Sequence, residues 1–172
     1  MPANTNLWVI DTSSIIAVRE FVPRTHQKVA YDGLTDLVTK GALTYPKQVI
    51  DELSRASNPN PSGPDMPLEW AKKNQAQATR YGTRFDLLRQ ILDHSQVKNV
   101  VDYEKIGVED ADPYVLELAV HLKEQGDVTV LTEDRRDRPD KLSMNTACGL
   151  LKLLCLPMEL FLAQQGIWSR TG

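Results

Sequence analysis

The feature that most constrains this chain is a short apolar run near the N-terminus that leads directly into an aspartate. Residues 7–10 are all apolar, and Asp11 and three hydroxyl residues follow them. Such a run is typical of a fully buried strand, most often in a parallel sheet. In open α/β sheets, ligands bind in the crevice beyond the carboxyl ends of the strands. A carboxylate at that place loses hydration unless a cation or hydrogen-bond donors compensate, so Asp11 is a candidate functional residue.

Strand-like and helix-like segments alternate along the rest of the chain. Further strands are expected at residues 42–45, 127–131 and 153–156, with a brief extended piece at 99–101. Helices are expected from Thr12, at 25–40, 47–55, 67–80 and 83–93, after Asp112, at 144–151 and from Pro157. Alternating strands and helices favour the α/β class. We therefore predict a three-layer α/β/α sandwich with a central, mainly parallel sheet.

Composition narrows the class of protein. The 172 residues suit a single domain, and 41% hydrophobic with 25% charged residues is ordinary for a soluble protein. The net charge of −3 makes phosphate neutralisation an unusual main source of affinity. Nucleic-acid binding would then need a metal ion or local basic patches. Basic residues do cluster at 72–84 and 135–138, although most such residues lie on solvated faces, paired with acids.

Targeting and cysteine signals point to the cytoplasm. Cys148 and Cys155 fit no zinc-binding spacing and make no disulfide framework, so we expect small apolar residues of a reducing compartment. The N-terminal residues do not resemble a signal peptide. No apolar run approaches the roughly 20 residues that span a bilayer. We expect a cytoplasmic protein without a membrane segment.

Three further acidic positions are expected near Asp11. Asp134 follows the strand at 127–131, Asp112 begins the helix that leads into that strand, and Glu52 lies in the helix at 47–55. Clustered carboxylates repel one another, and a bound divalent cation removes that conflict. Mg²⁺ prefers oxygen ligands, and a bound metal can activate water and polarise a phosphate. Four acids without histidine or cysteine ligands therefore indicate metal-dependent phosphodiester chemistry.

Each of these residues also has a purely structural interpretation. Asp112 before Pro113 can be a helix N-cap, as can Thr12 or Ser13. Asp134 can lie in a solvated turn, and Glu52 can be an exposed acid on an amphipathic helix. The functional hypothesis therefore depends on the four acids together.

The sequences around the four acids resemble the four motifs of the PIN domain, the fold of VapC-type toxin ribonucleases. They are VIDTSSII at 9–16, KQVIDEL at 47–53, ADPYVLELA at 111–119 and VLTED at 130–134. The chain is most similar to an uncharacterised bacterial and archaeal PIN branch, which also has cysteines like Cys148 and Cys155. The similarity covers nearly the whole chain. Relative to minimal PIN toxins, the segment at about 56–95 resembles a helical insertion within a single domain of residues 1–172.

The resemblance implies a ribonuclease that uses Mg²⁺ or Mn²⁺. Asp11, Asp112 and Asp134 would bind the metal directly or through water, and Glu52 would help to hold the metal or orient water. Thr12, Ser13 and Thr132 would be hydroxyl residues one contact away from the metal. The branch varies at the fourth acid, so Glu133 is an alternative to Asp134.

The resemblance also implies a biological setting: a homodimer, an RNA substrate and, for a toxin, a small antitoxin partner. The main hypothesis is an endoribonuclease that is the toxin of a toxin–antitoxin pair. The alternatives are a PIN scaffold that binds RNA or protein without cleavage, and a structure-specific DNA nuclease. A phosphatase that forms an aspartyl-phosphate is disfavoured, because it normally needs an aspartate where Ser13 stands.

Overall fold

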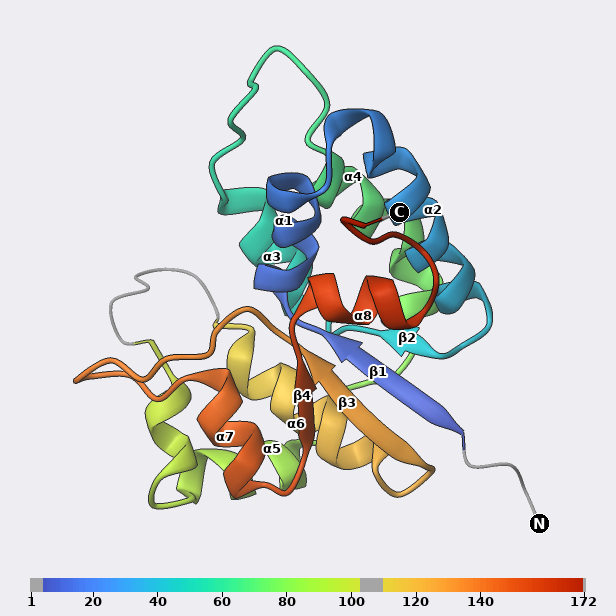
Figure 1. Ribbon diagram of the computed structural model, residues 1–172. Coiled ribbons are helices and arrows are strands. Elements are labelled where there is room, and N and C mark those ends of the chain that lie inside the picture. Colours follow the sequence, from blue (N-terminus) through green and yellow to red (C-terminus); the bar gives the residue numbers. More distant parts are fainter. Residues whose placement is uncertain (1–4, 103–109, 172) are drawn as a thin grey trace.

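A four-stranded parallel sheet forms the centre of the computed structural model, which describes residues 5–102 and 110–171. The strands are β1 (Asn6–Ile10), β2 (Leu43–Thr44), β3 (Asp127–Leu131) and β4 (Leu154–Leu156). Their order in the sheet is β2-β1-β3-β4, and every neighbouring pair is parallel. The predicted α/β class with a parallel sheet is confirmed (Figure 1).

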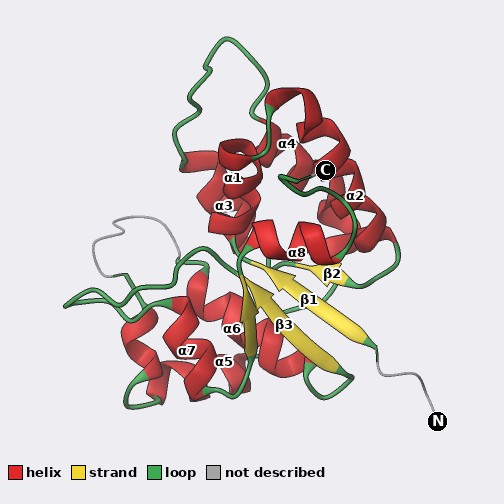
Figure 2. Ribbon diagram, in the orientation of Figure 1, coloured by secondary structure: helices red, strands yellow, loops and turns green. Residues whose placement is uncertain are grey.

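Helices cover both faces of this sheet (Figure 2). On one side lie α1 (Thr12–Phe21), α2 (Arg24–Thr39), α3 (Gln48–Arg55), α4 (Met66–Ala78) and α8 (Met158–Gln164). On the other side lie α5 (Phe85–Asp93), the 3₁₀ helix η1 (Val97–Val100), α6 (Asp112–Leu122) and α7 (Met144–Leu150). The arrangement is the expected three-layer sandwich, and the apolar side chains of β1 and β3, except the partly buried Trp8, are buried between the helical layers.

The pairing of β1 with β3 positions the carboxyl edge of the sheet. The register places Ile10 opposite Leu131, so both strands end at the same level. The backbone N–H of Asp11 donates to the Leu131 carbonyl at 2.9 Å, which continues the pairing for one more residue. The residues that follow the two strands, Asp11 and Thr132, are therefore brought side by side.

The segment at 56–95 contributes one helix to each of the two helical layers. Its first helix, α4, contacts α1, α2, α3 and β2, whereas α5 packs on α6 and η1. Tyr45 donates its N–H to Ala78 at 3.3 Å, at the point where the chain leaves α4. Because α4 ends at Ala78, the basic residues from Lys73 to Arg84 do not share one continuous helix face.

The prediction of an extended piece at 99–101 is wrong. Residues 99–101 were expected to be extended, but η1 occupies Val97–Val100. Both valines are fully buried, and residues three apart lie on the same side of a 3₁₀ turn. The turn is held further by the Asn99 carbonyl, which accepts from the Leu142 N–H at 2.8 Å. Burial of two apolar side chains at this spacing explains the compact conformation.

The two cysteines lie where the sequence placed them, among core and partly buried residues. Cys148 is fully buried in α7 and Cys155 is partly buried in β4, and both are free thiols.

The packing of α8 on the sheet gives a stability prediction. Phe161 is fully buried and meets the Trp8 ring edge-to-face at a centroid distance of 5.3 Å. We expect Phe161→Ala to lower the free energy of unfolding by about 3–5 kcal/mol. The neighbouring Leu160 is 45% exposed, and Leu160→Ala should change it by about 0.5 kcal/mol or less. Urea denaturation of both variants measures these changes. Equal losses in the free energy of unfolding would contradict this packing.

Candidate metal centre

Asp11 is fixed at the carboxyl end of β1 by backbone and side-chain contacts. Its side chain is only 3% exposed. The Thr132 hydroxyl donates to Oδ2 of Asp11 at 2.8 Å, and the Ser13 hydroxyl donates to the same oxygen at 3.0 Å. The Thr132 hydroxyl also accepts from the Asp134 N–H at 3.1 Å, so its own proton is available for Asp11. These contacts hold one orientation of the carboxylate.

Glu52 and Asp112 converge on Asp11 from two different helices. One carboxylate oxygen from each residue lies within 4.8 Å of the others, a separation that could accommodate a metal ion. Asp11 and Asp112 are buried and Glu52 is partly exposed. The Thr12 hydroxyl donates to Oε1 of Glu52 at 2.8 Å, which links the first turn of α1 to α3. Three of the four predicted acids therefore form one cluster, the acidic triad.

The structural interpretation of Asp112 as a helix cap is wrong. The helix α6 begins at Asp112 itself, and the residue in the capping position is Ala111, with no side-chain cap. The N–H of Asp112 instead donates to the Asp110 carboxylate at 3.1 Å. Thr12 and Ser13 do not cap α1 either, because Asp11 precedes that helix and their hydroxyls contact Glu52 and Asp11. The side chain of Asp112 is thus directed to the triad.

Asp134 lies beside the triad and is joined to it through a lysine. The Lys141 ammonium lies 2.9 Å from Oδ2 of Asp112 and 3.3 Å from Oδ2 of Asp134, and the lysine is 8% exposed. The Met144 N–H also donates to Oδ2 of Asp134, at 3.1 Å. Asp134 therefore contacts Asp112 through a shared cation.

Glu133 is directed away from this cluster. Its Oε1 accepts from the Met158 N–H at 2.7 Å, at the start of α8. Its own N–H donates to the Ser13 hydroxyl at 3.0 Å. Of the two candidates for the fourth acid, Asp134 is the one that Lys141 links to the triad.

Lys141 and Asp110 are parts of the site that the sequence analysis missed. Lys141 follows a charged loop that also contains Arg135, Arg136 and Arg138, and nothing in the local pattern distinguishes it. Asp110 stands two residues before Asp112, and proximity to a predicted acid is its only signal. Both depend on tertiary contacts that local sequence does not encode.

Burial and the neighbouring charges shift the pKa values of the residues in this cluster. Burial, together with the charge of Glu52, raises the pKa of Asp11 to about 6, although hydrogen bonds from Thr132 and Ser13 oppose the shift. Burial and the charges of Asp11 and Asp110 raise the pKa of Asp112, while Lys141 lowers it. Burial would lower the pKa of Lys141, but its two carboxylate partners outweigh that effect and raise it. Clustered carboxylate oxygens of this kind fit a hard divalent cation.

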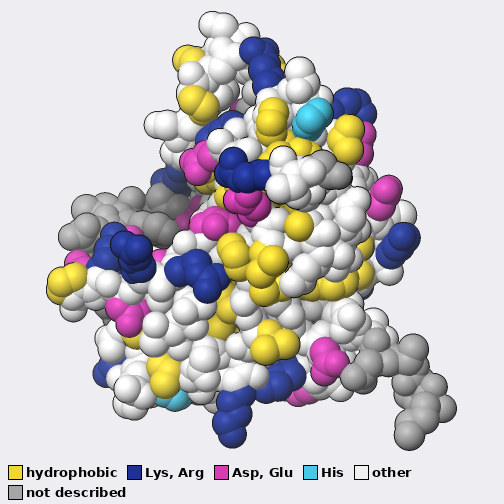
Figure 3. Space-filling model, viewed as in Figure 1, with side chains coloured by type: hydrophobic (Ala, Val, Ile, Leu, Met, Phe, Trp, Pro, Cys, Tyr) yellow, Lys and Arg dark blue, Asp and Glu magenta, His cyan; other side chains and the backbone are white. Residues whose placement is uncertain are grey.

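Two of the clustered basic residues, Arg84 and Arg138, lie in ion pairs with acidic side chains. Arg84 pairs with Asp86 at 2.8 Å and with Glu124 at 3.3 Å, and Arg138 lies 3.8 Å from Asp102. For these two residues the structure agrees with the expectation of solvated faces paired with acids. Basic side chains nevertheless flank the acidic ones on the face shown in Figure 3.

The raised pKa of Asp11 predicts a pH-dependent stability. The folded state holds the Asp11 proton more tightly than the unfolded state, whose pKa is near 3.8, so stability falls as pH rises from about 4 to about 6. In metal-free buffer at about pH 8, Asp11→Asn should raise the free energy of unfolding by at most about 3 kcal/mol. At about pH 4 this gain should vanish. Thermal melts across pH test it, with Asp51→Asn on the exposed face of α3 as the control, and a pH-independent difference would contradict it.

The buried position of Lys141 predicts a large cost for its removal. Lys141→Met should lower the free energy of unfolding by about 3–5 kcal/mol, because two carboxylates lose their shared cation. A second change, Asp112→Asn, should recover part of that loss. The exposed Lys40→Met is the control. Urea denaturation at neutral pH measures all three, and no recovery in the double variant would show that the pair is not coupled.

Comparisons of the chain with protein-family models, with curated proteins and with solved structures found no match. Within the described ranges, no helix is both long and apolar enough to cross a membrane. The similarity to PIN domains stays a prediction from the four sequence motifs. What the structure establishes is a parallel α/β fold with an acidic triad, able to hold a metal ion, at the carboxyl edge of its sheet.

Proposed function

We propose that this protein is an endoribonuclease that depends on Mg²⁺ or Mn²⁺. The observation that carries the proposal is the convergence of Asp11, Glu52 and Asp112 within 4.8 Å at the carboxyl edge of the sheet. In α/β sheets this edge is where ligands bind. The four motifs that resemble PIN domains support RNA as the substrate, and a toxin role is part of the same proposal.

The acidic triad would hold the cation through carboxylate oxygens, the ligands that Mg²⁺ and Mn²⁺ prefer. A bound divalent ion in such a site supplies a polarised phosphate and a water of lowered pKa. The hydroxyls of Thr132 and Ser13 fix the orientation of Asp11, and Thr12 does the same for Glu52. A carboxylate held in this way loses little conformational entropy when it binds an ion.

Lys141 supports a site for one ion. Its ammonium already neutralises part of the charge on Asp112 and Asp134, at 2.9 and 3.3 Å. Asp11 is held by the hydroxyls of Thr132 and Ser13 and not by this ammonium, so Asp11 would be the main ligand of the ion, together with the nearby oxygens of Glu52 and Asp112. Asp134 would act on the site through Lys141, as a positioning residue.

The geometry also disfavours a phosphatase that uses an aspartyl-phosphate. Such an enzyme needs a second acid two residues after the nucleophile, and Ser13 occupies that position. The Ser13 hydroxyl donates to Asp11 and accepts from the Glu133 N–H, which is a supporting role.

A cleavage assay on single-stranded RNA tests the proposal. We expect cleavage with Mg²⁺ or Mn²⁺ and none with EDTA. Asp11→Asn and Asp112→Asn should each reduce the rate by more than about 100-fold, because even residues that only support a metal ligand contribute 10–100-fold. Asp51→Asn, a nearby acid outside the triad, should cleave like the wild type.

Two measurements separate the alternatives. A matched DNA oligonucleotide distinguishes a DNA nuclease, which would cleave the DNA faster than the RNA. Calorimetry with Mn²⁺ distinguishes an inert scaffold, which would bind no metal at millimolar concentrations. Wild-type activity in Asp11→Asn would show that the site is assigned wrongly.

A further inference from the structure

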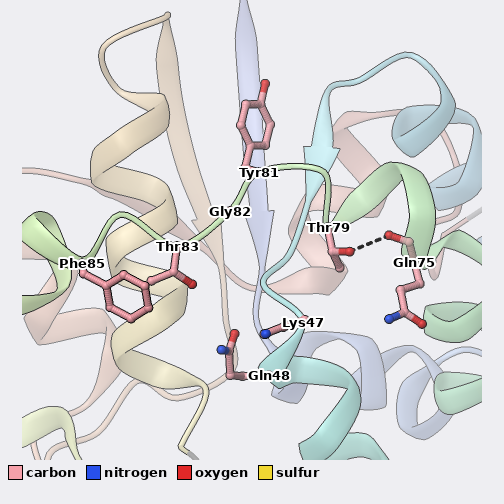
Figure 4. Close-up of a pocket in the computed structure, with 8 residues that line it drawn as sticks. All are labelled: Lys47, Gln48, Gln75, Thr79, Tyr81, Gly82, Thr83 and Phe85. Carbon is pink, nitrogen blue, oxygen red and sulfur yellow. Dashed lines mark hydrogen bonds between the residues drawn. The ribbon is translucent and has the colours of Figure 1, made fainter.

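A cavity with polar and apolar walls lies beside the first turn of α3, the helix that carries Glu52. Its volume is about 270 Å³, and its walls include Lys47, Gln48, Thr79, Thr83 and Phe85. Figure 4 shows that these residues come from the start of α3 and from the segment that links α4 to α5. The cavity is smaller than the pockets of about 300–1,000 Å³ that enclose drug-sized ligands. It suits one flat ring system with a few polar groups.

Gln48 is the feature that points to a ligand. Its side chain is 3% exposed, and its Oε1 is buried with no hydrogen-bond partner in the described part of the chain. A buried carbonyl oxygen without a donor lowers stability, so such groups are rare unless something else satisfies them. In Figure 4 the amide is directed from α3 toward the linking segment, across the cavity.

Gln48 is also tied geometrically to the triad. It precedes Glu52 by four residues in α3. Side chains four apart lie on the same face of a helix, with Cβ atoms about 5–6 Å apart. A ligand that contacts Gln48 is therefore next to the proposed metal site.

The other walls supply the remaining contacts that a nucleobase needs. Phe85 is 72% exposed, which leaves an aromatic ring available for stacking. The Thr79 hydroxyl donates to the Gln75 carbonyl at 2.7 Å, so it can still accept a hydrogen bond. Lys47 is exposed at the rim and adds a positive charge. Single-stranded RNA is commonly recognised through bases that stack on aromatic rings and bond polar groups by their edges.

We propose that this cavity binds one base of the RNA substrate, next to the phosphate that is cleaved; this inference rests on the proposed ribonuclease function. The base stacks on Phe85, and its edge meets the Gln48 amide. An amide offers an acceptor beside a donor, and each base has a complementary donor beside an acceptor on its pairing edge. Because the Gln48 Oε1 is closed to solvent in this conformation, the amide has to rotate as the base enters; Oε1 then accepts a hydrogen bond that no described residue donates.

RNA binding tests this proposal without relying on cleavage. We would measure the fluorescence anisotropy of labelled A, C and U octaribonucleotides with full-length Asp11→Asn protein, which keeps the RNA intact. Adding Phe85→Ala or Gln48→Met should weaken the tightest of the three complexes about tenfold, the loss typical of one stacked base. Leu92→Ala and Gln90→Met, exposed changes on α5, are the matched controls and should leave binding unchanged.

Two further readouts separate base binding from a fold defect. Gln48→Met should melt at the same temperature as its parent or higher, because it removes a buried oxygen without a partner. An octamer without bases should bind the parent and the two variants equally. If Phe85→Ala and Gln48→Met weaken this octamer as much as normal RNA, the cavity contacts the backbone and the proposal is wrong.

The outcomes also distinguish this proposal from the ribonuclease function. If wild-type protein cleaves RNA but the cavity variants bind it like their parent, the base site is overturned and the ribonuclease stands. If wild-type protein neither cleaves nor binds RNA, both are overturned.

Discussion

The parallel pairing of β1 with β3 is the interaction on which the rest of the site depends. It aligns Ile10 with Leu131, so Asp11 and Thr132 leave the sheet together although 121 residues separate them. The hydroxyl of Thr132 then fixes the Asp11 carboxylate. A slip of β3 by one residue would turn its side chains to the opposite faces of the sheet and would move Thr132 away from Asp11. The backbone register of β1 and β3 therefore determines which side chains meet at this edge of the sheet.

Buried charge is the second constraint, and it acts against stability. The triad is held near its neighbours by hydroxyl donors and by Lys141, yet burial and mutual repulsion still raise the pKa of Asp11 and Asp112. A fold with only structural requirements would gain stability by replacing these acids with neutral residues. Buried acids with shifted pKa values that lower stability are typical of functional sites. The Gln48 Oε1, which is buried without a hydrogen-bond partner among the described residues, also lowers stability.

The sequence predicted those features that local patterns encode. Apolar runs located β1 and β3, and the polar residues after them located Asp11 and Asp134. Local patterns failed where tertiary contacts decide the outcome. From the sequence alone, a helix cap was a sufficient explanation for Asp112. In the structure its carboxylate instead accepts from Lys141. Lys141 itself stands at the end of a loop rich in basic residues, and only its burial between two acids distinguishes it. Its role could not be predicted without the fold.

The helix α3 would fix the distance between the proposed base site and the proposed metal site. It has only eight residues, and Gln48 and Glu52 are one turn apart on it, about 6 Å along the axis at 1.5 Å per residue. Because a helix does not stretch, the distance from a base bound at Gln48 to a metal ion bound at Glu52 would be constant. The point of cleavage along an RNA would then be counted from that base and not from the ends of the strand. An enzyme built in this way selects its cut site by local sequence in single-stranded regions, without a need for a long complementary surface.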